Sequence, residues 1–157
     1  MKITIKPATI DNLKSIQELN LMLFEKEYKE FDPTLDCKWP FSPDAIEYFT
    51  ERLTKDNGCV FVAYADEQIV GYLAGGLHEA DAYRILPKFA ELENMLVLEK
   101  YRGLSIGTKL YQAFLDWCKT QRVTRLRVVA SAQNSQTINF YRKNGFVDYD
   151  LILEKDI

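Results

Sequence analysis

The sequence predicts a single α/β domain over residues 1–157, in which a central mixed β-sheet is flanked by about four helices. Strand-like and helix-like hydrophobic periodicities alternate along the chain in the order β-α-α-β-β-β-α-β-α-β. No internal repeat, linker or low-complexity segment interrupts this order, and the length suffices for one hydrophobic core. Helices are therefore expected on both faces of one sheet.

The first half of the chain contributes a strand and two helices. Alternating apolar residues predict a strand over residues 2–6, and Asp11 is expected to cap a helix with apolar residues at helical spacing through Leu23. A proline-containing loop covers residues 32–43. Ser42 and Pro43 then start a second helix that should extend to about residue 55, because serine caps helices and proline favours their first turn.

The second half supplies most of the sheet. Two strands around the turn at residues 65–68 form an expected hairpin. A loop at 78–88 leads to a third strand, and Asn144-Gly145 is expected to end the last helix in a left-handed cap. The expected elements are strands 59–64, 69–77 and 91–98, helix 105–121, strand 125–130, helix 134–143 and strand 147–153.

Composition excludes several functional classes. A net charge of −3 gives no reason to expect nucleic-acid binding, and no apolar run is long enough for a membrane span. The N-terminus lacks a signal-peptide core. The cysteines Cys37, Cys59 and Cys118 have neither disulfide-framework nor metal-site spacing. These features predict a cytoplasmic protein without a metal, and they leave a homodimer open.

A small-residue turn runs directly into the helix at 105–121 and is the most informative motif. Backbone N–H groups converge at such a helix N-terminus, where the helix dipole adds partial positive charge. Glycine at 103 and 107 lets an anion approach the backbone, and Arg102 and Lys109 add full charges. The turn therefore predicts a phosphate-binding site. Its spacing matches neither a Walker loop nor a dinucleotide fingerprint.

The order of a strand ending in Leu96-Val97 and then Arg102-x-x-Ser105-x-Gly107 resembles the acyl-CoA signature Arg/Gln-x-x-Gly-x-Gly/Ala of the GNAT superfamily of N-acetyltransferases. A later block, from Asn134 through Tyr141 to Gly145-Phe146, resembles that family's second motif. Ser105 stands where the first glycine is expected. The element order is also the layout of this family. The resemblance covers essentially the whole chain, most strongly from Glu91 to Phe146.

This resemblance implies that the chain uses acetyl-CoA to acetylate a small-molecule or peptide amine. The strand before the turn should splay from its neighbour at a bulge, and the backbone N–H of Val97 should polarise the thioester carbonyl. Asn134 should bind pantetheine, although capping its helix would also explain it. The expected cofactor-binding residues are Met95, Leu96, Val97, Arg102, Gly103, Leu104, Ser105, Ile106, Gly107, Thr108, Asn134 and Tyr141.

Three side chains are expected to move protons. The resemblance places Tyr141 near the cofactor sulfur, where a phenol could protonate the leaving thiolate, although packing in an apolar region is the alternative. Glu91 and Glu93 have the same parity on one strand, so both point to one face unless a bulge intervenes. Either could deprotonate the amine; ordered water is the alternative. His78 receives no role.

Acidic and aromatic residues gather where the first helix ends and in the following loop. The resemblance implies that this region walls the acceptor site, where carboxylates beside aromatic faces would suit a cationic amine; a solvated helix end is the alternative. The residues are Glu25, Glu27, Tyr28, Glu30, Phe31, Asp32, Asp36, Trp39 and Phe41.

A catalytically silent acyl-CoA-binding sensor or scaffold on the same fold is the competing function. Ser105 in place of glycine favours the silent module, whereas Tyr141 and Glu91 favour the enzyme. Nucleotide hydrolysis is excluded because the chain lacks a Walker lysine.

Overall fold

The computed structural model describes residues 1–86 and 88–157, and it shows one mixed five-stranded sheet with helices on both faces. The elements are β1 (Ile3–Pro7), α1 (Leu13–Glu30), α2 (Pro43–Thr54), β2 (Gly58–Ala65), β3 (Gln68–His78), β4 (Phe89–Val97), α3 (Ile106–Thr120), β5 (Arg125–Val128) and α4 (Ser135–Lys143). The predicted fold class and the order of these elements are confirmed as far as α4.

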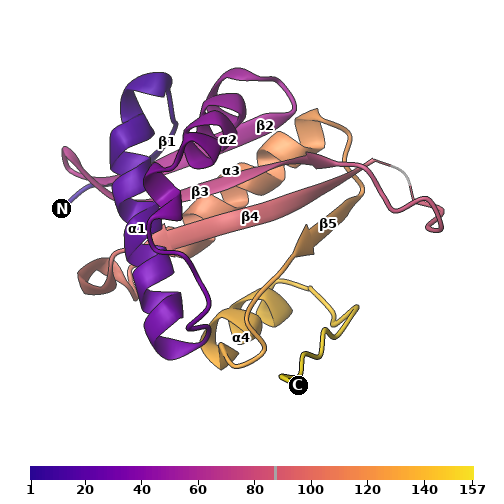
Figure 1. Cartoon of the computed structure of the whole chain (residues 1–157). Coiled ribbons are helices and arrows are strands. Elements are labelled where there is room, and N and C mark those ends of the chain that lie inside the picture. The colour runs from indigo at the N-terminus through magenta and orange to yellow at the C-terminus, as the bar shows by residue number, and fades with distance from the viewer. Residues whose placement is uncertain (87) are drawn as a thin grey trace.

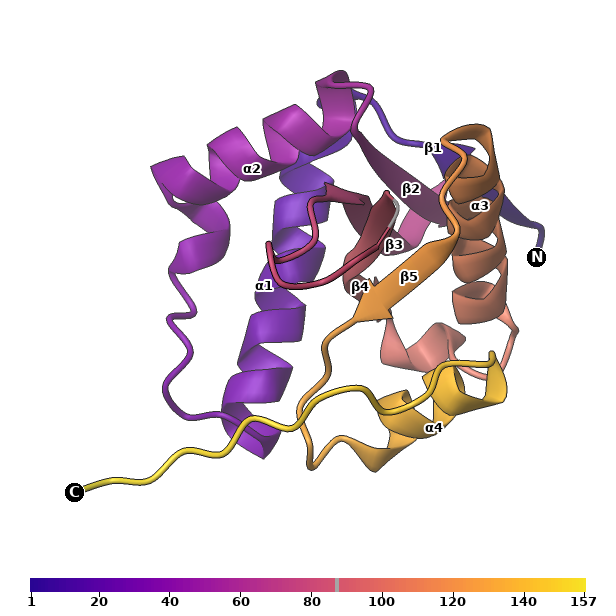
Figure 2. The ribbon, with the colours of Figure 1, turned by 90° about the vertical axis from the view of Figure 1, so that its right-hand side faces the viewer.

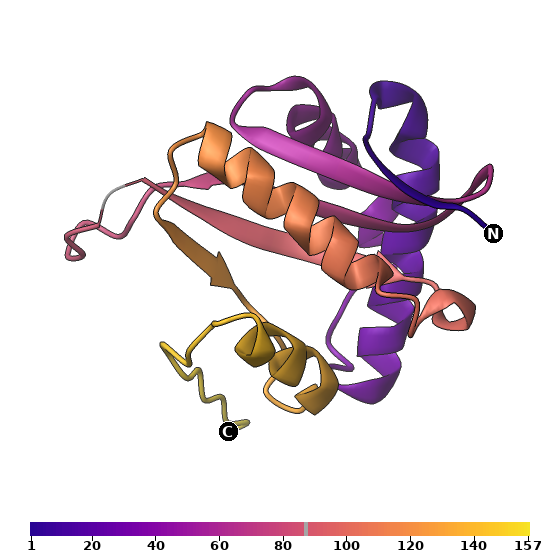
Figure 3. The same cartoon turned by 180° about the vertical axis from the view of Figure 1, so that it is seen from behind.

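The strands lie in the sheet in the order in which they occur along the chain. Neighbouring strands from β1 to β4 are antiparallel, and β5 pairs with β4 in parallel. In Figure 1, α1 and α2 lie in front of the sheet, whereas Figure 3 shows α3 crossing its other face. Two hydrophobic cores result, one on each face.

Local signals at several boundaries are confirmed. The Ser42 hydroxyl accepts a hydrogen bond from the Ala45 N–H, and Pro43 is the first residue of α2. Gly145 has a φ of 90° and its N–H bonds to the carbonyl of Arg142, which ends α4 in the expected way. The first helix differs, because Asp11 lies in a 3-10 turn and Asn12 precedes α1.

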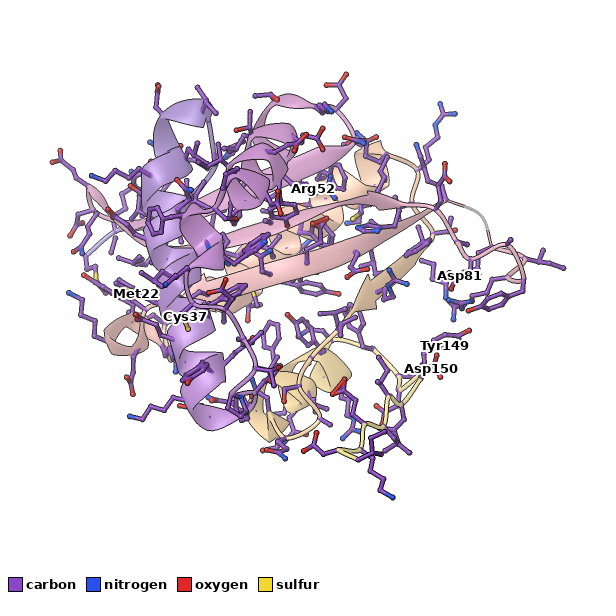
Figure 4. All side chains as sticks on the ribbon, viewed as in Figure 1. Met22, Cys37, Arg52, Asp81, Tyr149 and Asp150 are labelled. Carbon is purple, nitrogen blue, oxygen red and sulfur yellow. The ribbon has the colours of Figure 1, made fainter. Side chains whose placement is uncertain are left out.

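The strand predicted over residues 147–153 is wrong. No helix or strand follows α4, and the apolar side chains of this segment are exposed, 82% for Val147 and 83% for Leu153. The chain end extends away from the body in Figure 2, and before it does so the Tyr149 ring, labelled in Figure 4, lies 4.0 Å from the Arg84 guanidinium. An alternation of apolar and polar residues gives a strand only where the edge of a neighbouring strand is available for pairing. Residues 147–153 pair with no strand of the described sheet.

The fit between the sheet and α3 depends on Gly75. A Cβ at this position would lie 2.6 Å from Cε2 of Phe114 and 2.7 Å from the carbonyl oxygen of Glu91. Neither neighbour can move easily, because Phe114 is fully buried in α3 and the Glu91 carbonyl belongs to the paired backbone of β4. There is therefore no space for a methyl group between β3 and α3.

We expect Gly75→Ala to lower the free energy of unfolding by about 1–3 kcal/mol, because overpacking displaces neighbouring atoms. Gly107→Ala is the matched control: a Cβ there would meet nothing within 4 Å, and alanine favours helix. Chemical denaturation of both variants measures the difference. Equal stability of Gly75→Ala and the parent would contradict the packing described.

Candidate active site

The strands β4 and β5 separate halfway along β4. Their parallel pairing runs from Phe89 opposite Arg125 to Leu92 opposite Val128, and it ends there. β4 continues to Val97, paired only with β3 among the described residues. The β5 side of Met95, Leu96 and Val97 therefore presents a strand edge without a ladder partner, as predicted for a splayed strand.

A β-bulge accompanies the separation, but it lies earlier than Met95. Ala74 of β3 is opposite Asn94, whereas the next residue, Gly75, is opposite Leu92, so Glu93 is the extra residue of β4. The bulge changes the alternation of side chains. Glu93 and Asn94 both bond to Tyr48 of α2, although they are consecutive residues.

Glu93 is held by three side chains on the α2 side of the sheet. The Tyr48 hydroxyl donates to its Oε2 at 2.5 Å, and the Arg52 Nη2 lies 2.7 Å from its Oε1. His78 Nε2 is 3.3 Å from Oε1. The side chains of Arg52 and Glu93 are only 14% and 11% exposed, and Arg52 lies over the sheet in Figure 4. Burial, and then the Glu93 charge, raises the pKa of Tyr48 well above its usual range.

Glu91 faces the same side but has a different partner. Its register partner Gly76 faces α2, since a Cβ there would lie 2.8 Å from Cζ of Arg52. Arg127 of β5 donates from Nε to Glu91 Oε2 at 2.7 Å, and its Nη2 also contacts that oxygen. The expected shared face of the two glutamates is therefore present, and an arginine neutralises each of them.

The turn before α3 places two left-handed residues ahead of a helix N-terminus. Gly103 and Ser105 both have positive φ, 80° and 57°, so Ser105 adopts the left-handed conformation usual for glycine. The first hydrogen bond of the helix runs from the Lys109 N–H to the Ser105 carbonyl. The N–H groups of the residues before Lys109 therefore have no partner within the helix. The open side of Gly107 leaves this backbone accessible.

A cavity of about 420 Å³ adjoins the turn. It extends from α1 across the end of β4 to the start of α4, and its lining includes Met22, Lys26, Leu96, Leu98, Arg102 and Gln136. Lys26 pairs with Glu30 at 2.8 Å, and Arg102 Nε donates to the Val97 carbonyl at 3.1 Å. Glu30 and Glu99 also line the cavity, so its charged lining is balanced, and Arg102 is the cation that lies nearest the turn in sequence.

Tyr141 lies in an aromatic cluster behind the separated strands. Its ring centroid is 5.4 Å from those of both Phe140 and Phe146, and its side chain is buried. Burial is the main cause that raises its pKa. The hydroxyl makes no hydrogen bond to any described residue, so it is free to donate. Asn134 caps α4 by accepting from the Thr137 N–H at 3.2 Å, as its alternative reading predicted.

The sequence missed Tyr48, Arg52, Asn94 and His78, which surround Glu93. Tyr48 and Arg52 are four residues apart on α2, a spacing that places them on one helical face and could have indicated a shared partner. The described residues contain no group of three His, Cys, Asp or Glu side chains that could hold a metal ion. None of the helices in this part of the chain combines the length and apolar character that a membrane crossing requires.

Comparisons with known proteins agree on one family. The model of the acetyltransferase (GNAT) family matches residues 20–146. An N-alpha-acetyltransferase of Sulfurisphaera tokodaii is 31% identical over 110 residues, which cover 67% of this chain and 66% of that protein. The chain thus spans about two thirds of that relative's length. N-alpha-acetyltransferase 30 of Schizosaccharomyces pombe is 25% identical over 147 residues, or 94% of this chain and 85% of that protein.

A solved structure shares the fold. It is the aminoglycoside N-acetyltransferase AAC(6')-Iy in complex with the bisubstrate analogue CoA-S-monomethyl-acetylneamine. The TM-score is 0.77 at 17% identity, over 100% of this chain and 99% of that chain.

The Glu93 contacts predict a structural role for this carboxylate. Glu93→Gln leaves the Arg52 charge without its partner, so we expect the free energy of unfolding to fall by about 2–3 kcal/mol. Glu51→Gln, on the exposed surface of α2, should change stability little. Urea denaturation at neutral pH compares the two. An unchanged Glu93→Gln midpoint would mean that water replaces the ion pair without cost.

Proposed function

The chain belongs to the acetyltransferase (GNAT) family and is an acyltransferase, and we propose that it moves an acetyl group from acetyl-CoA to a primary amine. The amine attacks the thioester directly in a ternary complex. The observation that carries this proposal is the edge of β4 from Met95 to Val97, which has no ladder partner among the described residues and leads directly into the turn before α3. A strand edge and an anion site in this order suit a ligand with a pyrophosphate and an amide-containing arm.

The residues at the turn fit the pyrophosphate of acetyl-CoA. Residues 102–108 supply first-turn N–H groups and the left-handed backbone at Gly103 and Ser105. Arg102 adds a positive charge beside the cavity, whereas Lys26 is paired with Glu30. We assign the pantetheine arm to the β4 edge from Met95 to Val97, where the backbone groups of Met95 and Val97 point away from β3, and to Asn134.

The reacting groups belong between β4 and α4. The Val97 N–H would polarise the thioester carbonyl, because a fixed backbone dipole stabilises the charge that develops on that oxygen. Tyr141 would protonate the departing sulfur. A phenol is protonated at neutral pH even at its ordinary pKa, and the Tyr141 hydroxyl has no hydrogen bond to a described residue that would compete for its proton.

The acceptor would approach from the α1 and α2 side. Trp39 stacks on Phe24 at 5.5 Å and lies 6.0 Å from Tyr48, which gives this side an aromatic wall. Asn94 Oδ1 is buried without a partner among the described residues and could accept a hydrogen bond from the bound amine. Of the two glutamates on β4, Glu91 has one carboxylate oxygen without a described hydrogen bond, whereas both oxygens of Glu93 are bonded. Glu91 is thus the better base of the two.

We take the α-amine of a peptide as the first acceptor to test. The relatives from Sulfurisphaera tokodaii and Schizosaccharomyces pombe are named N-alpha-acetyltransferases. The aminoglycoside enzyme shares only the fold, so an aminoglycoside is the comparison acceptor. A thiol-release assay with peptides, monoamines and aminoglycosides tests the proposal. CoA release that depends on an amine supports the enzyme, whereas acetyl-CoA binding without release supports the silent module.

We expect acetyl-CoA to raise the Tm of the parent protein, because a ligand that binds only the folded state stabilises it. Gly107→Leu should abolish this shift, since its side chain would fill the space through which the pyrophosphate approaches. The unliganded Tm should stay close to the parent value, because that space contains no protein atom within 4 Å of the added Cβ. Differential scanning fluorimetry measures both. A normal shift in Gly107→Leu would remove the turn from the cofactor site.

Tyr141→Phe should lower kcat by ~10²-fold or more while changing acetyl-CoA affinity little, because a general acid acts in the transition state. The ring packing with Phe140 and Phe146 is retained, so the fold should persist. Steady-state kinetics and direct binding separate the two effects. If turnover stays within a few-fold of the parent, water protonates the thiolate instead.

A further inference from the structure

Glu27 occupies an unusual position on α1. Ile16, Asn20 and Leu23 form the stripe of the helix that faces the sheet, and Glu27 continues this stripe one turn later. Leu23 packs against the core that contains Leu96 of β4. Glu27 therefore lies on the side of α1 that faces the sheet, and it is only partly exposed. Its neighbour Lys26 lines the cavity at the end of β4.

The Glu27 carboxylate has no salt bridge or hydrogen bond to any described residue. This distinguishes it from Glu91 and Glu93, which arginines hold. Burial raises the pKa of Glu27; the neighbouring Lys26 opposes this effect, and Asp32 adds to it. Glu27 is thus a half-buried carboxylate with open lone pairs, as a proton acceptor must be.

Its charge acts on two tyrosine hydroxyls from different elements. Burial is the first cause that raises the pKa of Tyr141 of α4, and Glu27 contributes to it. Burial also raises the pKa of Tyr72 of β3, and Glu27 adds to that increase. The Tyr72 hydroxyl accepts a hydrogen bond from Asn20 Nδ2 at 2.8 Å, so its position is fixed. Glu27 therefore lies within electrostatic reach of the proposed proton donor, Tyr141.

We propose that Glu27 is the catalytic base that takes the proton from the acceptor ammonium, an assignment that rests on the proposed acetyl transfer. An ammonium proton passes to a Glu27 Oε atom, and the nitrogen lone pair forms the bond to the thioester carbonyl carbon. The C–S bond breaks, and its electron pair takes the Tyr141 proton to give free CoA. The second nitrogen proton restores Tyr141, and Glu27 releases its proton to solvent.

The position of Glu27 gives the reaction a defined pH dependence. Only the carboxylate form accepts a proton, so kcat/KM should fall as the pH drops through the Glu27 pKa. Because burial raises that pKa, the fall begins at a higher pH than for an exposed glutamate. The groups around it are Lys26 and Asp32 on its own side, Tyr72 from β3 and Tyr141 from α4.

Glu27→Gln tests the assignment with the intact chain, acetyl-CoA and a short peptide with a free α-amine, or the amine for which the parent releases most CoA. We expect kcat/KM near neutral pH to fall by ~10²-fold. The loss should shrink at alkaline pH, where the amine enters already deprotonated, and the Tm shift with acetyl-CoA should persist. Glu18→Gln, an exposed carboxylate on the same helix, is the matched control. Glu27→Asp should retain the acidic limb of the pH profile.

Glu91→Gln provides the competing measurement. A large loss in Glu91→Gln with parent-like kinetics in Glu27→Gln would overturn the assignment and make Glu91 the base. Small effects in both variants would also overturn it and favour ordered water. Failure of the parent to release CoA with any amine would instead remove the proposed acetyl transfer itself, and the Glu27 assignment with it.

Discussion

The bulge at Glu93 and the end of pairing at Leu92 occur at the same point of β4, and the rest of the site depends on that coincidence. A strand inside a sheet uses the backbone groups on both of its edges, so it cannot bind a ligand through them. β4 stays paired with β3 on both sides of the bulge, and its pairing with β5 ends at Leu92. Rigidity and an available edge are thereby combined in one strand.

Side chains on the α2 side stabilise this distortion. A bulge directs two consecutive residues to one face, and both Glu93 and Asn94 need polar partners there. Tyr48 serves both, since its hydroxyl donates to Glu93 and accepts from Asn94, while Arg52 neutralises the carboxylate. Burying such a pair costs desolvation, so it adds less stability than its short distances suggest. Its value is conformational, because a strand slipped by one residue would bury Glu93 against α3 without a partner.

Sequence patterns predicted the parts of the molecule that local chemistry controls. Ser42 identified a helix start, and the turn at 65–68 identified a hairpin, because a cap or a tight turn depends on residues only a few positions apart. The place of the bulge was not predictable, since it depends on the register between β3 and β4. The strand predicted at 147–153 was wrong for a related reason. Its apolar and polar residues do alternate, but a strand also needs the edge of another strand to pair with, and the sequence does not specify that edge. Glu27 was grouped with the acidic and aromatic residues expected to wall the acceptor site and received no role of its own, because helical spacing alone does not say how far the buried stripe of α1 extends.

The carboxylates on β4 are paired with arginines, whereas the side chains proposed to exchange protons lie on the helices and are not paired with any described residue. Arg52 and Arg127 neutralise Glu93 and Glu91, so the α2 face of β4 carries little net negative charge despite two carboxylates. A polycationic acceptor would therefore gain little attraction from this strand, whereas a single amine beside aromatic side chains would still be accommodated. Glu27 and Tyr141 belong to α1 and α4, and neither is held by a described hydrogen bond of its side chain. In the proposed reaction β4 contributes backbone dipoles, and the helices on either side of the separated strands supply the groups that exchange protons.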